Sequence, residues 1–72
     1  MAEQWFYASV EWIWQGGTIR INIPHQQEVH QRGSYQEVVE TLTRLGMQGW
    51  EVVACVGVGD WIYWTLKHRG ES

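Results

Sequence analysis

Nine residues, Leu45-Gly46-Met47-Gln48-Gly49-Trp50-Glu51-Val52-Val53, contain a predicted helix end, a tight turn and the start of a strand. Glycine adopts positive φ at low steric cost, so Gly46 and Gly49 are expected to stop the helix and turn the chain. Trp50 then begins an apolar run and is expected to seal the helix onto a sheet. The segment therefore predicts a helix-to-strand junction, which is a structural feature and not a functional signature.

On either side of this junction, sequence periodicity predicts two strands before the helix and two after it. The expected strands run from Gln4 to Trp14, from Thr18 to Ile23, from Trp50 to Val58 and from Trp61 to His68. The expected core face of the first strand consists of Phe6, Ala8, Val10, Trp12 and Trp14. The polar, aperiodic stretch from His25 to Gly33 is expected to be a loop, and loops often carry function.

The helix is expected to run from about Tyr35 to Leu45. Ser34 and Glu37 have the spacing of a capping box, in which each side chain satisfies a free backbone N–H. The stripe expected to be buried consists of Val38, Leu42 and Leu45, at positions i, i+4 and i+7. Thr41 is placed mostly outside this stripe, so a single face of the helix should lie against a sheet.

The order strand, strand, helix, strand, strand predicts an α+β fold, ββαββ, with one helix packed on one face of an antiparallel sheet. The whole chain, 1–72, is expected to form a single domain. One helix covers one face only, so the opposite face is expected to be aromatic and to lie in a homo-oligomer interface. Alternation assigns to that face Trp5, Tyr7, Ser9, Glu11, Glu51, Val53, Cys55, Trp61, Tyr63, Thr65 and Lys67.

Composition excludes some classes of partner. The chain of 72 residues has a net charge of −3, which would repel the phosphates of long DNA or RNA. Cys55 is the one cysteine, so no intramolecular disulfide can form, and self-association is the expected supplement to a small core. No apolar run approaches the roughly 20 residues that span a bilayer, and no secretory signal is evident, so a cytoplasmic protein is expected.

Four segments together resemble a known pattern. They are Trp5-Phe6-Tyr7, Leu42 with Leu45-Gly46, Gly49-Trp50-Glu51-Val52-Val53, and Tyr63 through Lys67. An aromatic first strand, a helix ending in Leu-Gly-x-x-Gly-Trp-Glu, a Val-rich strand and a last strand with a basic end resemble a family of small bacterial and phage domains of unknown function. The resemblance implies a helix packed on an antiparallel sheet, and it assigns no catalytic residue.

Aromatic and cationic side chains form the candidate ligand-binding set. Stacking on a ring contributes about 1 to 3 kcal/mol per base, and arginine holds a phosphate through two parallel hydrogen bonds. A small nucleotide is therefore the expected ligand, bound in pockets that more than one chain closes. The candidates are Trp5, Tyr7, Arg20, His25, His30, Arg32, Trp61, Tyr63, Lys67 and Arg69.

Metal and cofactor sites are not favoured. His25, His30 and His68 lack carboxylate or thiolate partners at a recognised spacing, so neither a metal nor a cofactor is expected. Cys55 lies in the middle of a predicted strand, where a packed thiol is unreactive. An enzyme is therefore the least favoured class.

Glu11 and Glu51 could face each other across neighbouring strands as an acid/base pair, but unpaired surface carboxylates are commoner than catalytic ones. The sequence thus favours a non-catalytic homo-oligomer that binds a small ligand. Its hypothetical role is that of a phage anti-defence sponge, which sequesters a nucleotide signal of bacterial immunity. The alternative is a structural or adaptor homo-oligomer whose aromatic face makes only protein contacts.

Overall fold

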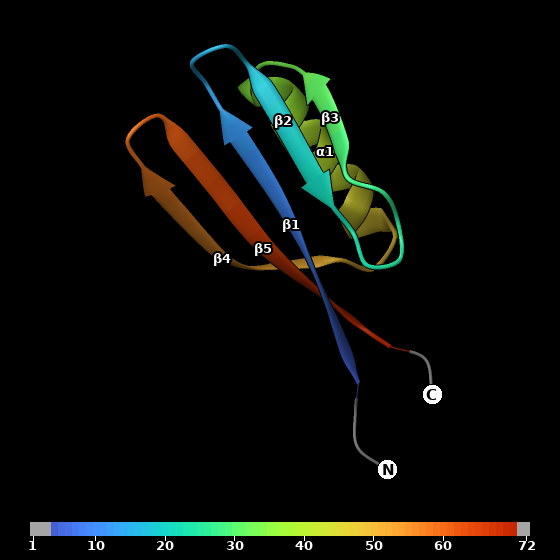
Figure 1. Cartoon of the computed structure of the whole chain (residues 1–72). Coiled ribbons are helices and arrows are strands. Elements are labelled where there is room, and N and C mark those ends of the chain that lie inside the picture. Colours follow the sequence, from blue (N-terminus) through green and yellow to red (C-terminus); the bar gives the residue numbers. More distant parts are fainter. Residues whose placement is uncertain (1–3, 71–72) are drawn as a thin grey trace.

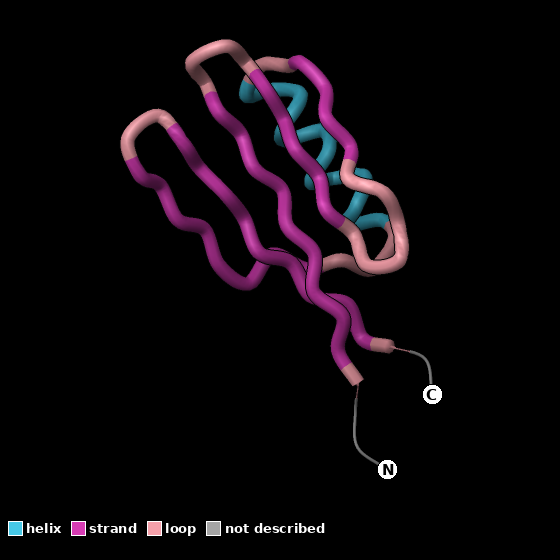
Figure 2. Tube along the Cα trace, viewed as in Figure 1, coloured by secondary structure: helices cyan, strands magenta, loops and turns pink. Residues whose placement is uncertain are grey.

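The computed structural model describes residues 4–70, which form one five-stranded antiparallel sheet and one helix (Figure 1). The elements are β1 (Trp5–Ile13), β2 (Thr18–Asn22), β3 (Val29–Arg32), α1 (Tyr35–Met47), β4 (Glu51–Val58) and β5 (Trp61–Arg69). The strand order is β3-β2-β1-β5-β4. Figure 2 shows α1 behind β2 and β3, at the side of the sheet away from β4. None of the described helical residues forms a segment with the length and apolarity of a membrane span.

The predicted α+β class and antiparallel sheet are confirmed, but the sheet has one strand more than predicted. The segment expected to be a loop contains β3, in which Val29 pairs with Ile21 and His30 with Arg20. The loop prediction was wrong because β3 is a short edge strand. Most of its residues are exposed, so it needs no alternation of apolar and polar side chains.

The core lies between α1 and the sheet. Its buried apolar residues are Ala8, Val10, Ile19, Ile21, Val38, Leu45, Trp64 and Leu66. Phe6 and Trp14, predicted to face the core, are 38% and 53% exposed because they lie at or beyond the ends of β1. The alternation is therefore confirmed within β1, since Phe6 shares the face of Ala8, but burial decreases toward the ends of the strand.

Thr41 is buried in the face of α1 that packs on the sheet, which corrects the predicted stripe. It lies three residues after Val38 and four before Leu45, and both of these neighbours are buried. The Thr41 hydroxyl donates a hydrogen bond to the Glu37 carbonyl at 2.8 Å. This internal bond lets a polar side chain be buried without an unpaired donor.

Ser34 is the N-cap residue of α1, but the hydrogen bonds of a capping box are not made. The Ser34 hydroxyl donates to the Glu37 carboxylate at 3.2 Å and caps no backbone amide. The backbone amides of Glu37 and Val38 donate to the Ser34 carbonyl, each at 3.1 Å. The two side chains thus satisfy each other, while the backbone closes the first turn.

The junction after α1 turns on one glycine, not two. Gly46 lies inside α1, whereas Gly49 has a φ of 99°. The Trp50 amide donates to the Leu45 carbonyl and the Gly49 amide to the Gly46 carbonyl, each at 3.0 Å, which is a Schellman motif. A Cβ at Gly49 would lie 2.6 Å from Nε2 of His68. Backbone conformation and space therefore both require glycine at this position.

A β-bulge at Val53 reverses the alternation of β4. Beyond the bulge, Ala54 lies opposite Thr65 and Cys55 lies opposite Trp64. Residues that pair across two strands share a face, so Cys55 lies on the side of the sheet that carries α1. The prediction that Cys55 faces away from α1 was wrong, because period-2 alternation assumes an uninterrupted register.

Candidate functional site

The structure divides the predicted ligand-binding residues between two places. Eight of them lie by register on the sheet face away from α1, here called the open face: Trp5, Tyr7, Arg20, His30, Arg32, Trp61, Tyr63 and Lys67. His25 lines a pocket beside the C-terminal end of α1, and Arg69, which pairs with Trp5 and so belongs by register to the open face, borders that pocket at the end of β5. The residues therefore do not form one common site within a single chain.

The rings of the open face form two groups. At the end of the sheet where β1 begins, the Lys67 ammonium lies 4.4 Å from the centroid of the Trp5 ring, a cation–π contact. Farther along β5, the rings of Trp61 and Tyr63 lie 5.7 Å apart, tilted by 50°. Tyr7 is 59% exposed beside Lys67.

The Trp61–Tyr63 group borders a shallow pocket of about 460 Å³, which Ser9, Glu11, Val58 and Thr65 also line. The Glu11 carboxylate disfavours a phosphate here. Two like charges about 4 Å apart repel by about 1 kcal/mol in water and about 4 kcal/mol near a protein surface. This pocket is better suited to a neutral or cationic group than to a nucleotide phosphate.

Glu11 and Glu51 do not face each other, because β5 lies between β1 and β4. Glu11 lies opposite Tyr63 on one side and Arg20 on the other, and Glu51 lies opposite Lys67. The predicted arrangement of the two carboxylates as an acid/base pair was therefore wrong. It assumed that their two strands are neighbours in the sheet.

The basic residues of β2 and β3 lie among acceptors. His30 pairs with the Glu28 carboxylate, and hydrogen bonds from His30 and then Asn22 lower the pKa of that carboxyl below its ordinary value. Arg20 lies between Glu11 and His30 in the register, and its Nε is buried without a hydrogen-bond partner. Arg32 lies opposite Thr18, where β3 ends. Arg20, His30 and Arg32 therefore do not belong to the two groups of rings on β1 and β5.

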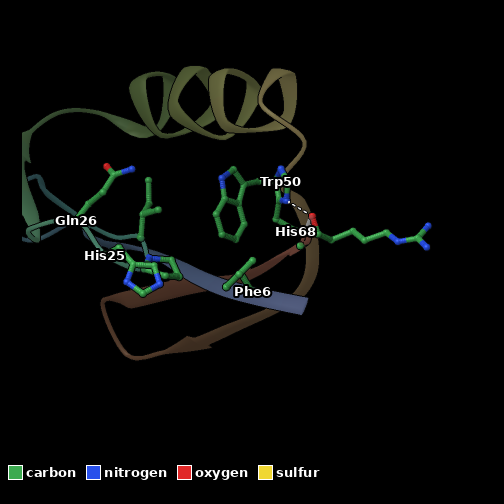
Figure 3. A pocket seen from close by; sticks show the side chains of 9 residues that line it. Phe6, His25, Gln26, Trp50 and His68 are labelled. Atoms are coloured by element: carbon green, nitrogen blue, oxygen red, sulfur yellow. Dashed lines mark hydrogen bonds between the residues drawn. The ribbon is translucent and has the colours of Figure 1, made fainter. Parts of the chain in front are cut away.

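The pocket beside α1, here called the ring pocket, has a volume of about 440 Å³. Figure 3 shows Trp50 between α1 and Phe6, with His25 and Gln26 on one side and His68 on the other. Its lining consists of Phe6, Ile23, Pro24, His25, Gln26, Trp50, His68, Arg69 and Gly70. Four parts of the chain thus meet here: the start of β1, the β2–β3 turn, the residue before β4 and the end of β5.

Two ring contacts form the walls of the ring pocket. The His25 ring meets the Phe6 ring edge to face, with centroids 6.4 Å apart and planes at 75°. The Trp50 ring lies 5.1 Å from the His68 ring at 60°. His25 has a φ of 66°, a left-handed conformation in the turn that follows Pro24. The turn therefore holds an aromatic side chain at some cost in backbone energy.

His68 is held by two carbonyl groups. Its Nε2 lies 3.0 Å from the Gln48 carbonyl oxygen, and its Nδ1 lies 2.7 Å from the Arg69 carbonyl oxygen. These two contacts fix the orientation of the His68 ring beside Trp50.

The charge of the ring pocket differs from that of the whole chain. Arg69 and His68 both line it, and none of the described lining residues is an Asp or a Glu. A protein with a net charge of −3 thus has a pocket that no described carboxylate lines, with Arg69 at its rim on the end of β5. A planar ligand with an anionic group matches this combination of rings and charge.

Sequence reasoning missed Phe6, Trp50, Gln26 and His68 as pocket residues. Phe6 and Trp50 were assigned to core packing, and His68 was considered as a metal ligand and as one of several cationic side chains beside a ligand. The available signal was the position of Phe6 and His68 at the outer ends of two terminal strands, where they pair with each other. Within residues 4–70 no group of three or more His, Cys, Asp or Glu is placed to hold a metal.

Comparisons with protein-family models, curated proteins and solved structures find no match to this chain.

Proposed function

We propose that this protein is a non-catalytic homo-oligomer that binds a small nucleotide in the ring pocket. The observation that carries the proposal is a pocket of about 440 Å³ with aromatic walls and no described carboxylate in its lining. A nucleotide combines a flat base with an anionic phosphate. The base would stack against Trp50 and His25, and the phosphate would extend past the end of β5 to reach Arg69 at the rim of the pocket.

Chemistry, and not size, supports a nucleotide in this pocket over one in the pocket at Trp61 and Tyr63. Sites for small molecules typically measure about 300 to 1,000 Å³, a range that includes both pockets. Charge separates them, since Glu11 lines the open-face pocket, whereas no described carboxylate lines the ring pocket and Arg69 lies at its rim. A bidentate arginine–phosphate contact is among the stronger hydrogen-bonded pairs in proteins.

The biological role that suits such a protein is sequestration. A chain of 72 residues that holds a nucleotide unchanged would lower the free concentration of that nucleotide in proportion to its own amount. Cyclic nucleotide signals of bacterial immunity are the proposed targets, and a phage anti-defence sponge is the proposed setting.

His25→Gly is expected to weaken nucleotide binding about tenfold while leaving the fold intact. The change removes one aromatic wall, and stacking contributes about 1 to 3 kcal/mol. Glycine suits the φ of 66° at this position better than histidine does. Isothermal titration calorimetry with cyclic dinucleotides, ADP-ribose derivatives and mononucleotides measures the affinity, and the thermal unfolding midpoint reports the fold.

Arg69→Ala is expected to weaken binding about 10- to 100-fold, because hydrogen bonds to charged groups contribute about 1.5 to 3 kcal/mol. Arg32→Ala is the matched control. Arg32 is also an exposed arginine near a strand end, but it lies at the opposite end of the sheet, about 27 Å away along β1. Equal losses from the two variants, or no heat with any nucleotide from the folded protein, would refute the proposed site.

A structural or adaptor role is the second candidate, and one observation favours it. All eight residues of β4 are exposed, so this strand is available for contacts with protein. An adaptor without a ligand should show no shift of its unfolding midpoint with any nucleotide in the panel. A binder should be stabilised by about 2.7 kcal/mol when the free ligand is at 100 times its Kd.

A further inference from the structure

β4 is an unusual edge strand. All eight of its residues are exposed, including Val53 at 46% and Val58 at 62%. It pairs with β5 on one side only, and α1 lies at the other half of the sheet (Figure 1). Both faces and the outer backbone edge of this strand are therefore accessible.

The two edges of the sheet differ in how they are protected. β3 has four residues, Val29-His30-Gln31-Arg32, two of which carry basic side chains. β4 contains no charge after Glu51 and no proline, and its sequence from Val52 to Val58 is apolar or glycine. Natural edge strands are commonly kept short, charged or bulged to prevent pairing with other chains. β4 lacks these protections beyond its bulge at Val53.

We propose, building on the homo-oligomer of the proposed function, that β4 pairs with β4 of a second copy. The two strands would run antiparallel about a two-fold axis and join two sheets into one. An uncharged segment is self-complementary, because no like charges meet when it pairs with its own copy. Glu51, the one charged residue of β4, lies opposite Lys67 of its own chain, outside the paired segment.

The faces of β4 determine the register. Ala54, Val56 and Val58 share the open face, whereas Cys55 and Gly57 share the face of α1. Pairing the regular segment 54–58 with itself places Val56 on the two-fold axis. Open-face residues then meet only open-face residues, as the period-2 geometry of a continuous sheet requires. The Val53 bulge falls just outside the pairing.

One strand pair makes a small interface, below the roughly 1,200 Å² of total surface that stable complexes bury at the least. A dimer in concentration-dependent equilibrium with the monomer is therefore expected. Sedimentation velocity over a concentration series, without nucleotide, measures this equilibrium. A parent protein that stays monomeric throughout the series overturns the proposal.

Val56→Lys is expected to abolish the dimer, because two lysines would face each other on the axis. Val39→Lys is the matched control. Val39 lies on α1 and is 45% exposed, against 42% for Val56, so the two changes add the same charge at similarly exposed sites. The control should dimerise like the parent. A Val56→Lys variant that still dimerises would show that another surface, such as the aromatic open face, forms the interface.

Cross-linking tests the register without weakening the interface. In a Cys55→Ser background, Val56→Cys should give a disulfide-linked dimer on mild oxidation, because directly opposed residues lie within the Cα separation that a disulfide spans. Cys55→Ser alone should give none. Absence of the cross-link overturns the pairing about Val56. Nucleotide calorimetry separates the two proposals: a monomeric Val56→Lys variant that binds nucleotide preserves the ligand site without the β4 contact, and a parent protein that dimerises but binds no nucleotide preserves the β4 contact without the ligand site.

Discussion

Gly49→Ala is expected to lower the free energy of unfolding by about 2 to 3 kcal/mol. A residue with a Cβ in a left-handed conformation costs about 1 to 2 kcal/mol, and the φ of Gly49 is 99°. The new Cβ would also lie 2.6 Å from Nε2 of His68, which must then move. The hydrogen bond from His68 to the Gln48 carbonyl would be lost, at a cost of about 1 kcal/mol.

Urea denaturation followed by tryptophan fluorescence measures the Gly49→Ala effect, and Gly46→Ala is its control. Gly46 lies inside α1, and a Cβ there would meet no atom within 4 Å. Alanine is favoured over glycine in a helix interior by about 0.8 to 1 kcal/mol, so Gly46→Ala is expected to raise stability. The same substitution at two glycines three residues apart should thus act in opposite directions. A loss of stability at both would contradict the described helix end.

Leu66→Ala is expected to lower the free energy of unfolding by about 3 to 4 kcal/mol. The side chain is fully buried, and β5 lies between β1 and β4. Leucine-to-alanine changes in protein cores cost about 2 to 5 kcal/mol, since they remove apolar contacts and leave a cavity. A chain of 72 residues has a total stability of about 4 to 11 kcal/mol, so this one change removes a large share.

Val52→Ala is the comparison for Leu66→Ala, because Val52 lies directly opposite Leu66 on β4. Val52 is 43% exposed, so its truncation should cost less than about 1 kcal/mol. Guanidinium unfolding of both variants at the same protein concentration gives the two differences. Losses of equal size would mean that β4 is buried in solution to the same extent as β5.

Sequence periodicity predicted the fold correctly where a strand pairs with its neighbours without a shift in register. Ile19 and Ile21 are buried as alternation predicts, since β2 lies inside the sheet and is covered by α1. The bulge at Val53 could not be predicted, because it is a property of how β4 pairs with β5 and leaves no local sequence signal. Its consequence was the wrong face for Cys55.

The candidate site was predicted less well than the fold. Residue type singled out His25 and Arg69 as ligand-binding candidates, and both border the ring pocket, but Phe6 and Trp50 beside them come from segments with no shared periodicity. His25 has a positive φ because of the conformation of its turn, and the polar sequence of this turn does not specify that conformation. Alternation assigns residues to the two faces of a sheet. It does not predict the ring pocket, because this pocket lies at the end of the sheet, where separate segments of the chain meet.

The place of β1 and β5 in the sheet bears on how the chain folds. The strand pair at its centre runs from Trp5 with Arg69 to Ile13 with Trp61, so each of its contacts spans most of the sequence. Closing so large a loop is slow, and folds dominated by distant contacts reach the native state later than helical bundles. During synthesis, β4 has no strand to pair with until β5 has left the ribosome. The sheet is therefore completed only after translation of β5, and a chain that stops before β5 leaves β4 without a neighbour in the sheet.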